Sequence, residues 1–431
     1  MAQVIGPVVR GFVGHSPTIA IRFWDGSVIG PPDSATSIAV HSPRALRRLL
    51  YSPNELGAAR AYVAGEIDLE GDIFEGLGVR DNLSASDQEA PLKLRWRIWW
   101  DLLRAAMATG VIGTPLPHPP EEAHLRGKRH SKERDAAAIS HHYNVSNDFY
   151  RLFLGETMTY SCGYFAWPDS TLDEAQRGKY DLICRKLGLS EGMRLLDVGC
   201  GWGGMTRYAA EHYGVSAVGV TLSTRQAEYA RAATAEAGLS DRVEIRVQDY
   251  REIQDGPFDA ISSIGMFEHV GLSRLNEYLA DLHDLLKPGA RLLNHGISRP
   301  FGPSGFDRNS FVERYVFPDG ELHEVGLVVS AAQGRHLEVR DVESLREHYA
   351  RTLRHWVRNL EGNWDKALEL VGPARARIWR LYMAGSALNF EAGRTSIHQI
   401  LAVRPNGDGS SGIPPTREEL LNLRVEKVSS P

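Results

Sequence analysis

Short apolar strands alternate with amphipathic helices from about residue 135 onward, and this alternation limits the fold more than any other feature of the chain. Five strands are predicted, over residues 194–198, 217–220, 243–247, 260–264 and 291–295. When helices connect successive strands in this way, the strands run mostly parallel and the helices cover both faces of the sheet. The sequence therefore predicts an α/β fold for this part of the chain.

A helix is predicted between the fourth and fifth strands. Its apolar side chains recur at helical spacing, so one face is expected to pack on the sheet. They are Leu275, Tyr278, Leu279, Leu282 and Leu286. The tripeptide Lys287-Pro288-Gly289 is typical of a helix end, so the helix is expected to include residue 286.

A chain of 431 residues usually forms two domains. Residues 1–120 are predicted to form a smaller α+β domain, residues 121–134 a basic linker, and residues 135–431 the catalytic domain. In the first domain, residues 18–24 and 35–40 are predicted strands, and Asp25-Gly26 is a hairpin turn signal.

The helix predicted over residues 91–110 contains Trp96, Trp99 and Trp100 among basic residues. Two interpretations are open. The favoured one packs the tryptophans into the core of the domain, because an apolar stripe at helical spacing usually lies inside. The other one places them on a surface that contacts lipid headgroups.

Charge and cysteine content exclude several classes of protein. A net charge of −5 gives no general attraction to nucleic acid, and an anionic membrane would need a local basic patch such as residues 126–134. Cys162, Cys184 and Cys200 lack the spacing of metal ligands, so no metal site is expected. Neither a signal peptide nor a membrane span is recognisable, so a cytoplasmic protein is expected.

A glycine-rich turn follows the first predicted strand of the α/β region. Gly199, Gly201 and Gly203 allow the backbone to turn tightly and approach a ligand at the edge of the sheet. Their G-x-G-x-G spacing differs from the dinucleotide fingerprint G-x-G-x-x-G. Asp197, inside the strand, is expected to order the turn. This combination resembles the first motif of class I methyltransferases, whose Rossmann-like fold binds S-adenosylmethionine.

Several further motifs occur in the order of one family. They are the segments 141–150, 160–165, 199–203, 221–226, 266–271, 295–297 and 348–356. The chain resembles the cyclopropane fatty acid synthase family over essentially its whole length, in the long form with a leading domain. One departure is Ser386, where family members often carry a cysteine. A second is the end of the strand at 217–220, where most class I methyltransferases place an acidic residue.

The resemblance implies two ligands and the residues that bind them. Bicarbonate would be bound by Cys162, Glu268, His295, Tyr349 and the backbone of Ile297. S-adenosylmethionine would be bound by Tyr160, Ser161, Gly199, Gly201, Gly203, Thr221, Leu222 and Gln226. Asp249 follows the third predicted strand, where the adenine is usually bound, and Asp197 is added as the residue that orders the loop.

By the same resemblance, the expected reaction is methyl transfer to the cis double bond of an unsaturated fatty acyl chain on a phospholipid. Bound bicarbonate would deprotonate the resulting carbocation and give a cyclopropane or a methylene branch, such as a 10-methylene acid. The protein would act peripherally at the inner face of the membrane, with the leading domain governing access to lipid. A methylene product would need a reductase partner. The sequence leaves open whether the protein forms a homo-oligomer. The alternatives are an amine N-methyltransferase of the same fold and an inactive lipid-binding protein.

Overall fold

A computed structural model describes residues 1–6, 18–79, 92–123, 134, 146–302 and 310–421. The chain divides into two compact units. The first unit comprises Met1–His124, Asp307–Pro318 and Leu360–Leu388. The second unit comprises Leu125–Phe306, Asp319–Asn359 and Asn389–Pro431.

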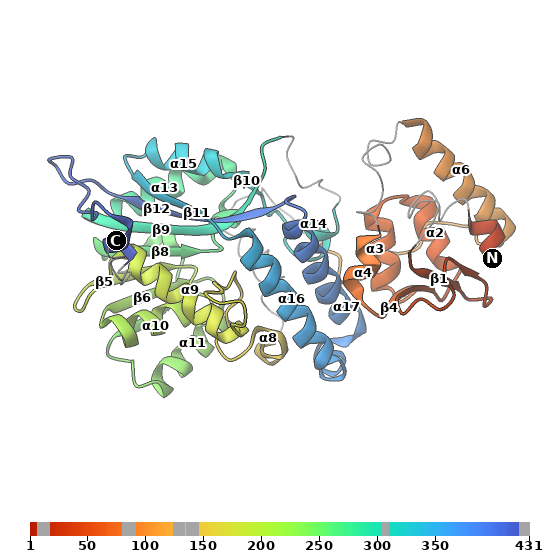
Figure 1. Cartoon of the computed structure of the whole chain (residues 1–431), viewed down its shortest axis with the longest axis horizontal. Coiled ribbons are helices and arrows are strands. Elements are labelled where there is room, and N and C mark those ends of the chain that lie inside the picture. The colour runs from red at the N-terminus through yellow and green to blue at the C-terminus, as the bar shows by residue number, and fades with distance from the viewer. Residues whose placement is uncertain (7–17, 80–91, 124–133, 135–145, 303–309, 422–431) are drawn as a thin grey trace, which may run out of the picture. The chain divides into compact units, whose positions relative to one another are not determined.

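The first unit contains a small sheet with the strand order β2-β1-β3-β4. Its strands are β1 (Ala20–Phe23), β2 (Val28–Ile29), β3 (Ser37–Val40) and β4 (Ile67–Glu70). Helices α2 (Arg44–Tyr51), α3 (Glu55–Val63), α4 (Ile73–Gly78) and α6 (Leu92–Ala108) accompany it (Figure 1). The two predicted strands and the hairpin turn at Asp25-Gly26 are confirmed, since β1 pairs antiparallel with β2.

Two late segments join this unit, although the sequence predicted that they belong to the catalytic domain. Helix α17 (Trp364–Glu391) is attached to the first part of the chain by polar contacts: Arg377 forms an ion pair with Asp68 at 2.6 Å, and Arg380 donates to the hydroxyl of Tyr62 at 3.3 Å. Helix α14 (Phe311–Tyr315) is attached through the hydroxyl of Tyr315, which donates to buried Glu122 at 3.3 Å. These long-range pairs have no local sequence signal.

The tryptophans of helix α6 correct the interpretation that the sequence favoured. Trp96, Trp99 and Trp100 are 57%, 40% and 43% exposed, so they lie on the surface. The helix instead buries Leu102, Ala105 and Ala106 against the sheet of the first unit and helix α2. The three indole rings contact one another edge to face, with centroids 5.8 Å and 5.4 Å apart.

The second unit contains the large sheet, with the strand order β11-β12-β9-β8-β5-β6-β7 and with β10 beside β9. Its strands are β5 (Arg194–Val198), β6 (Ser216–Thr221), β7 (Val243–Val247), β8 (Phe258–Ile264), β9 (Leu286–Arg299), β10 (His323–Glu324), β11 (Glu338–Ser344) and β12 (Ser396–Val403). All five predicted strands are present. Strands β5 to β9 run parallel, whereas β12 pairs antiparallel with β9, and β11 with β12.

Helices cover both faces of this sheet, as predicted (Figure 1). On one face lie α9 (Leu172–Leu187), α10 (Gly204–Tyr213) and α11 (Thr224–Glu236), and on the other lie α13 (Leu275–Asp284) and α15 (Val325–Gln333). Successive side chains of a strand point to opposite faces of the sheet, so each face has its own hydrophobic core. In β9, Leu292 packs with α13 and α15, while Leu293 packs with α9 and α10.

The chain leaves helix α13 earlier than the sequence predicted. The helix ends at Asp284, and Leu286 already pairs with Phe258 as the first residue of strand β9. The strand also continues past residue 295 to Arg299, because β12 pairs with it from Arg291 to Ser298. The hydrogen bonds of β9 to β8 and β12 therefore determine where the strand begins, and the helix-end signal at residues 287–289 does not.

Among the described residues, no helix is both long enough and apolar enough to cross a bilayer.

The close approach of Phe267 to β9 generates a test of the packing. A methyl group at position 296 would overlap the ring of Phe267, so Gly296→Ala should lower the free energy of unfolding by about 1–3 kcal/mol. Gly326 of helix α15 has open space around its Cα, and Gly326→Ala should be neutral or stabilise by about 0.5–1 kcal/mol. Thermal denaturation of both variants checks this. Equal melting temperatures would show that β9 does not pack as described.

Candidate active site

The glycine-rich turn lies between β5 and α10, at the carboxyl edge of the large sheet. Gly199, Gly201 and Gly203 have φ angles of +80°, +54° and +76°, which side-chain-bearing residues rarely adopt. The amide nitrogens of Gly199 and Cys200 donate to the carbonyl of Val220 on β6, at 3.0 and 2.9 Å. The turn is thereby fixed against the neighbouring strand, with its backbone open to a ligand.

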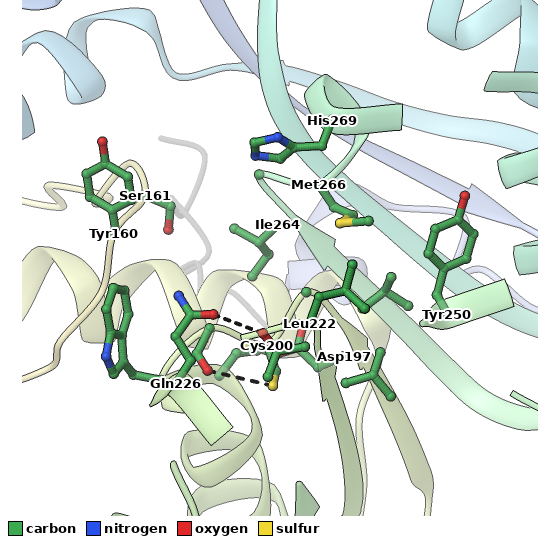
Figure 2. A pocket seen from close by; sticks show the side chains of 18 of the residues that line it. Tyr160, Ser161, Asp197, Cys200, Leu222, Gln226, Tyr250, Ile264, Met266 and His269 are labelled. Carbon is green, nitrogen blue, oxygen red and sulfur yellow. Dashed lines mark hydrogen bonds between the residues drawn. The ribbon is translucent and has the colours of Figure 1, made fainter. Parts of the chain in front are cut away.

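A pocket opens beside this turn (Figure 2). Most of the residues predicted to bind the cofactor line it: Tyr160, Ser161, Asp197, Gly199, Gly201, Thr221, Leu222, Gln226 and Asp249. Figure 2 shows Tyr160 and Ser161 on one side and Met266 and Tyr250 on another, with Gln226 and Cys200 near the turn. Gly203 is not among the lining residues and instead lies close to Ala230 of α11. Its role in cofactor binding stays a prediction.

Asp197 lies under the pocket and is buried. Its carboxylate accepts a hydrogen bond from the hydroxyl of Ser262 on β8 at 2.7 Å. Burial raises the pKa of Asp197 to about 6, although the Ser262 bond and the nearby Lys179 oppose this shift. At neutral pH the pocket therefore carries a negative charge next to the glycine turn.

The polar residues after β6 and β7 are held by local contacts. The hydroxyl of Thr221 donates to the side-chain oxygen of Gln226 at 2.9 Å, which leaves the amide nitrogen of Gln226 for other contacts. Asp249 pairs with Arg251 at 2.6 Å. These contacts fix the part of the pocket that includes Asp249, beside which the resemblance places the adenine.

Several pocket residues were not predicted from the sequence, among them His269 and Lys179. His269 belongs to the same motif as Glu268 but lines the pocket itself, and burial lowers its pKa to about 4. Lys179 of helix α9 is fully buried and reaches the pocket next to Ser161, to which it donates at 2.8 Å. The signal for Lys179 was a lysine at a core position of an amphipathic helix, between Ala175 and Ile183.

Glu268 lies outside this pocket, on the short helix α12 (Phe267–Val270). One carboxylate oxygen accepts the backbone N–H of Ile297 at 2.7 Å, whereas the other is buried without a partner among the described residues. Burial raises the pKa of Glu268 to about 7. The Ile297 N–H, expected to bind the ion, therefore binds Glu268 instead.

His295 lies two residues before Ile297 on β9, and both side chains project from the same face of the sheet. The imidazole is fully buried, and neither ring nitrogen has a hydrogen-bond partner in the described part of the chain. Burial, reinforced by nearby Lys179, lowers the pKa of His295 well below its usual value. The ring is therefore neutral at physiological pH.

Cys162 and Tyr349 meet at the carbonyl of Leu345. The thiol of Cys162 lies 3.7 Å from this oxygen, and the backbone N–H of Tyr349, in helix α16 (Arg346–Gly362), donates to it at 3.0 Å. Leu345 in turn donates to Ile397, which pairs with Ile297. Burial raises the pKa of Cys162, so it is a thiol. Contacts through Leu345 thus link Cys162 and Tyr349 to β12, which pairs with Ile297 on β9. The binding of an anion by these residues stays a prediction.

The segment expected to cover the cofactor is only partly described. Residues 141–145 lie outside the described residues, as do residues 126–133 of the basic run. The structure describes the next residues, which include helix α8 (Asn147–Leu154). Asn147 is the first residue of this helix. Its side-chain oxygen accepts a hydrogen bond from the indole of Trp202, in the glycine turn, at 2.9 Å.

The open space at Gly201 generates a test of the cofactor site. A methyl group here would meet no protein atom and would point into the space that the ligand needs. Gly201→Ala should therefore weaken binding of S-adenosylhomocysteine by more than about ten-fold, or ~1.4 kcal/mol. Gly238→Ala is the matched control, because Gly238 has a similar φ of +68° and open surroundings away from the pocket. Calorimetry that finds equal affinities in the two variants would contradict this assignment.

Comparison with known proteins agrees with this geometry. A protein-family model described as mycolic acid cyclopropane synthetase matches residues 130–400. A probable fatty acid methyltransferase of Pseudomonas putida is 42% identical over 413 residues, which cover 94% of this chain and 96% of that protein. The tuberculostearic acid methyltransferase UfaA1 of Mycobacterium tuberculosis is 32% identical over 419 residues, which cover 94% of this chain and 91% of that protein.

Solved structures give the same picture. Mycolic acid cyclopropane synthase CmaA1, in complex with SAH and CTAB, matches with a TM-score of 0.59 and 36% identity, covering 62% of this chain and 97% of that one. Coclaurine N-methyltransferase, bound to N-methylheliamine and SAH, matches with a TM-score of 0.57 and 25% identity, covering 64% and 84%. The predicted class I methyltransferase fold is confirmed. The chain belongs to the mycolic acid cyclopropane synthetase family and is an S-adenosylmethionine-dependent methyltransferase.

Proposed function

We propose that the enzyme methylates the cis double bond of an unsaturated fatty acyl chain on a phospholipid, and that a bound bicarbonate ion removes a proton from the resulting carbocation. The observation that carries the proposal is the group of unpartnered buried atoms on Glu268 and His295. A buried polar atom without a partner costs about 1–3 kcal/mol. Several such atoms at one end of β9 favour a small polar ligand between them.

The protonation states of these residues suit an anion. Glu268, with a pKa of about 7, can carry a proton and donate it in a hydrogen bond. Neutral His295 offers one N–H, and Cys162 offers a thiol. A singly charged ion with several oxygens can therefore be bound without placing two negative charges side by side.

Bicarbonate would supply a small base beside the reacting carbon. An alkene is a weak nucleophile, so alignment with the sulfonium methyl group supplies much of the catalysis. The carbocation must be kept away from water and from nucleophilic side chains. The buried thiol of Cys162 is not ionised, which protects it from alkylation.

The substrate class follows from the relatives. The long relatives are named as a probable fatty acid methyltransferase and a tuberculostearic acid methyltransferase, and shorter ones as cyclopropane mycolic acid synthases. Loss of a proton from the added methyl group would close a cyclopropane, whereas a preceding hydride shift would give a methylene branch. Both products share the same cation and base, so the proposal includes both.

Glu268→Gln tests the role of Glu268 beside the ion. It retains the shape and the hydrogen bonds of the side chain but cannot exchange a proton with the bound ion. Turnover should therefore fall by about 100-fold or more, while the affinity for S-adenosylhomocysteine changes less than about two-fold. Turnover of the wild type should fall when dissolved carbon dioxide is removed and recover when bicarbonate is added. The assay uses labelled S-adenosylmethionine with unsaturated phospholipid vesicles, and with small amines as the alternative substrate.

Glu321→Gln is the matched control, because the Glu321 carboxylate also accepts a backbone N–H, from Leu272 at 2.9 Å. Its turnover should be normal. Full activity of Glu268→Gln, or a wild type indifferent to bicarbonate, would show that the proton leaves by another route. Label on the amines and none on the lipid would identify an N-methyltransferase.

We further propose that helix α6 brings the first unit to the bilayer surface. Trp96, Trp99 and Trp100 form an exposed aromatic surface, and Met107 on the same helix is 54% exposed. Tryptophan is favoured at the interface between lipid headgroups and acyl chains. This peripheral contact would give the active site access to its substrate.

The variant Trp96→Ala/Trp100→Ala should reduce binding to phosphatidylglycerol-containing vesicles by about ten-fold or more, because it removes two large apolar surfaces. Trp167→Ala is the control, since Trp167 is 72% exposed but lies in the second unit. Vesicle sedimentation measures both variants. If they bind equally well, the membrane contact lies elsewhere.

A further inference from the structure

We infer that Lys179 and Ser161 form the binding site for the carboxylate of the methionine portion of S-adenosylmethionine. Lys179 is fully buried, and no carboxylate of the described residues lies within ion-pair distance of its ammonium group. Within the described part of the chain, its one hydrogen bond to a side chain is to the Ser161 hydroxyl, at 2.8 Å.

A lysine in this environment is unusual. An ammonium group has three donors, and buried charges are normally paired. The ring of Tyr180 lies 4.5 Å from the Lys179 nitrogen and gives only a weak attraction. The remaining donors of Lys179 therefore lack an anionic partner, and the group lines the cofactor pocket.

The next buried lysine on helix α9 differs from Lys179 because its charge is paired within the protein. Lys186, two turns later, is also fully buried, but it pairs with Asp341 at 3.0 Å and with Glu343. Helix α9 thus carries one lysine whose charge is satisfied within the protein. The other, Lys179, faces a ligand site.

The position of Lys179 selects which anion it binds. Lys179, Ser161 and Asp197 all line the pocket beside the glycine turn, whereas Glu268 and His295 do not. The amino-acid end of the cofactor carries a carboxylate and an ammonium group. A pocket with a lysine and an aspartate matches both charges. Lys179 also lies near enough to His295 and Cys162 to shift their pKa values, so bicarbonate is the competing anion. The shared pocket lining favours the cofactor carboxylate over that ion.

The test compares two ligands that differ at this end. S-adenosylhomocysteine contains the amino-acid carboxylate, whereas 5′-methylthioadenosine lacks the amino-acid group altogether. Lys179→Met should weaken binding of S-adenosylhomocysteine by about ten- to hundred-fold, because a charged hydrogen bond is lost. Binding of 5′-methylthioadenosine should change less than about two-fold. Isothermal calorimetry gives both dissociation constants.

A second measurement uses the wild type and so does not depend on how the variant folds. Burial lowers the pKa of Lys179 to about 7, opposed by Cys162 and Asp197. At pH 8 the empty site is therefore mostly unprotonated, and carboxylate binding raises this pKa, so protons should be taken up. The neighbouring groups do not titrate there, since the pKa of Asp197 is about 6, that of Tyr180 about 12, that of Cys162 is raised and that of His295 is lowered.

Calorimetry in two buffers of different ionisation enthalpy measures this uptake. It should accompany S-adenosylhomocysteine, be absent with 5′-methylthioadenosine, and disappear in Lys179→Gln. Lys186→Met is the control and should lose stability without changing the ratio of the two affinities. The inference is wrong if Lys179→Met weakens both ligands equally. It is also wrong if that variant keeps its affinity for S-adenosylhomocysteine but loses the response of turnover to bicarbonate.

Discussion

The pairing of strand β9 on both of its sides is the constraint on which the active site depends. Strand β8 runs parallel to it and ends at Ile264, whereas β12 runs antiparallel and continues beyond that point. On the side of β8, β10 takes over the pairing only at Ser298 and Arg299, so a short gap in the ladder lies between the two strands. The N–H of Ile297 falls in this gap and binds Glu268. If β8 extended as far as β9, the N–H of Ile297 would bind a carbonyl of β8. The Glu268 carboxylate would then lose its hydrogen bond to Ile297.

Burial of ionisable groups next to one another gives the site its chemistry. Asp197 and Lys179 have pKa values of about 6 and 7, both displaced toward neutrality by desolvation. Each charge is costly in the empty protein, and ligands of opposite charge relieve this cost. Cofactor binding is thus favoured by the free energy gained when these buried charges of the second unit are paired.

Much of this could be predicted from the sequence. The apolar strands and the turn at Gly199 to Gly203 are local signals, and the motif order identified the family and most pocket residues. Three features could not be predicted, because they depend on distant partners. Periodicity alone cannot decide which face of helix α6 is buried, so Trp96 was misplaced. Lysine is common on exposed helix faces, so the sequence did not show that Lys179 is buried in the core. Docking of helix α17 onto Asp68 and Tyr62 has no local signal at all.

The first unit is assembled from three stretches of chain, the last of which ends at Leu388. Domains generally fold as units while the ribosome delivers the chain from its N-terminus. Here the small sheet emerges before the large one but lacks helices α14 and α17 until residue 388 has been made. The core of the second unit, including β5 to β9, leaves the ribosome in between. The first unit is therefore completed late, because Tyr315 and Arg380, which bind Glu122 and Tyr62, are synthesised long after these two residues.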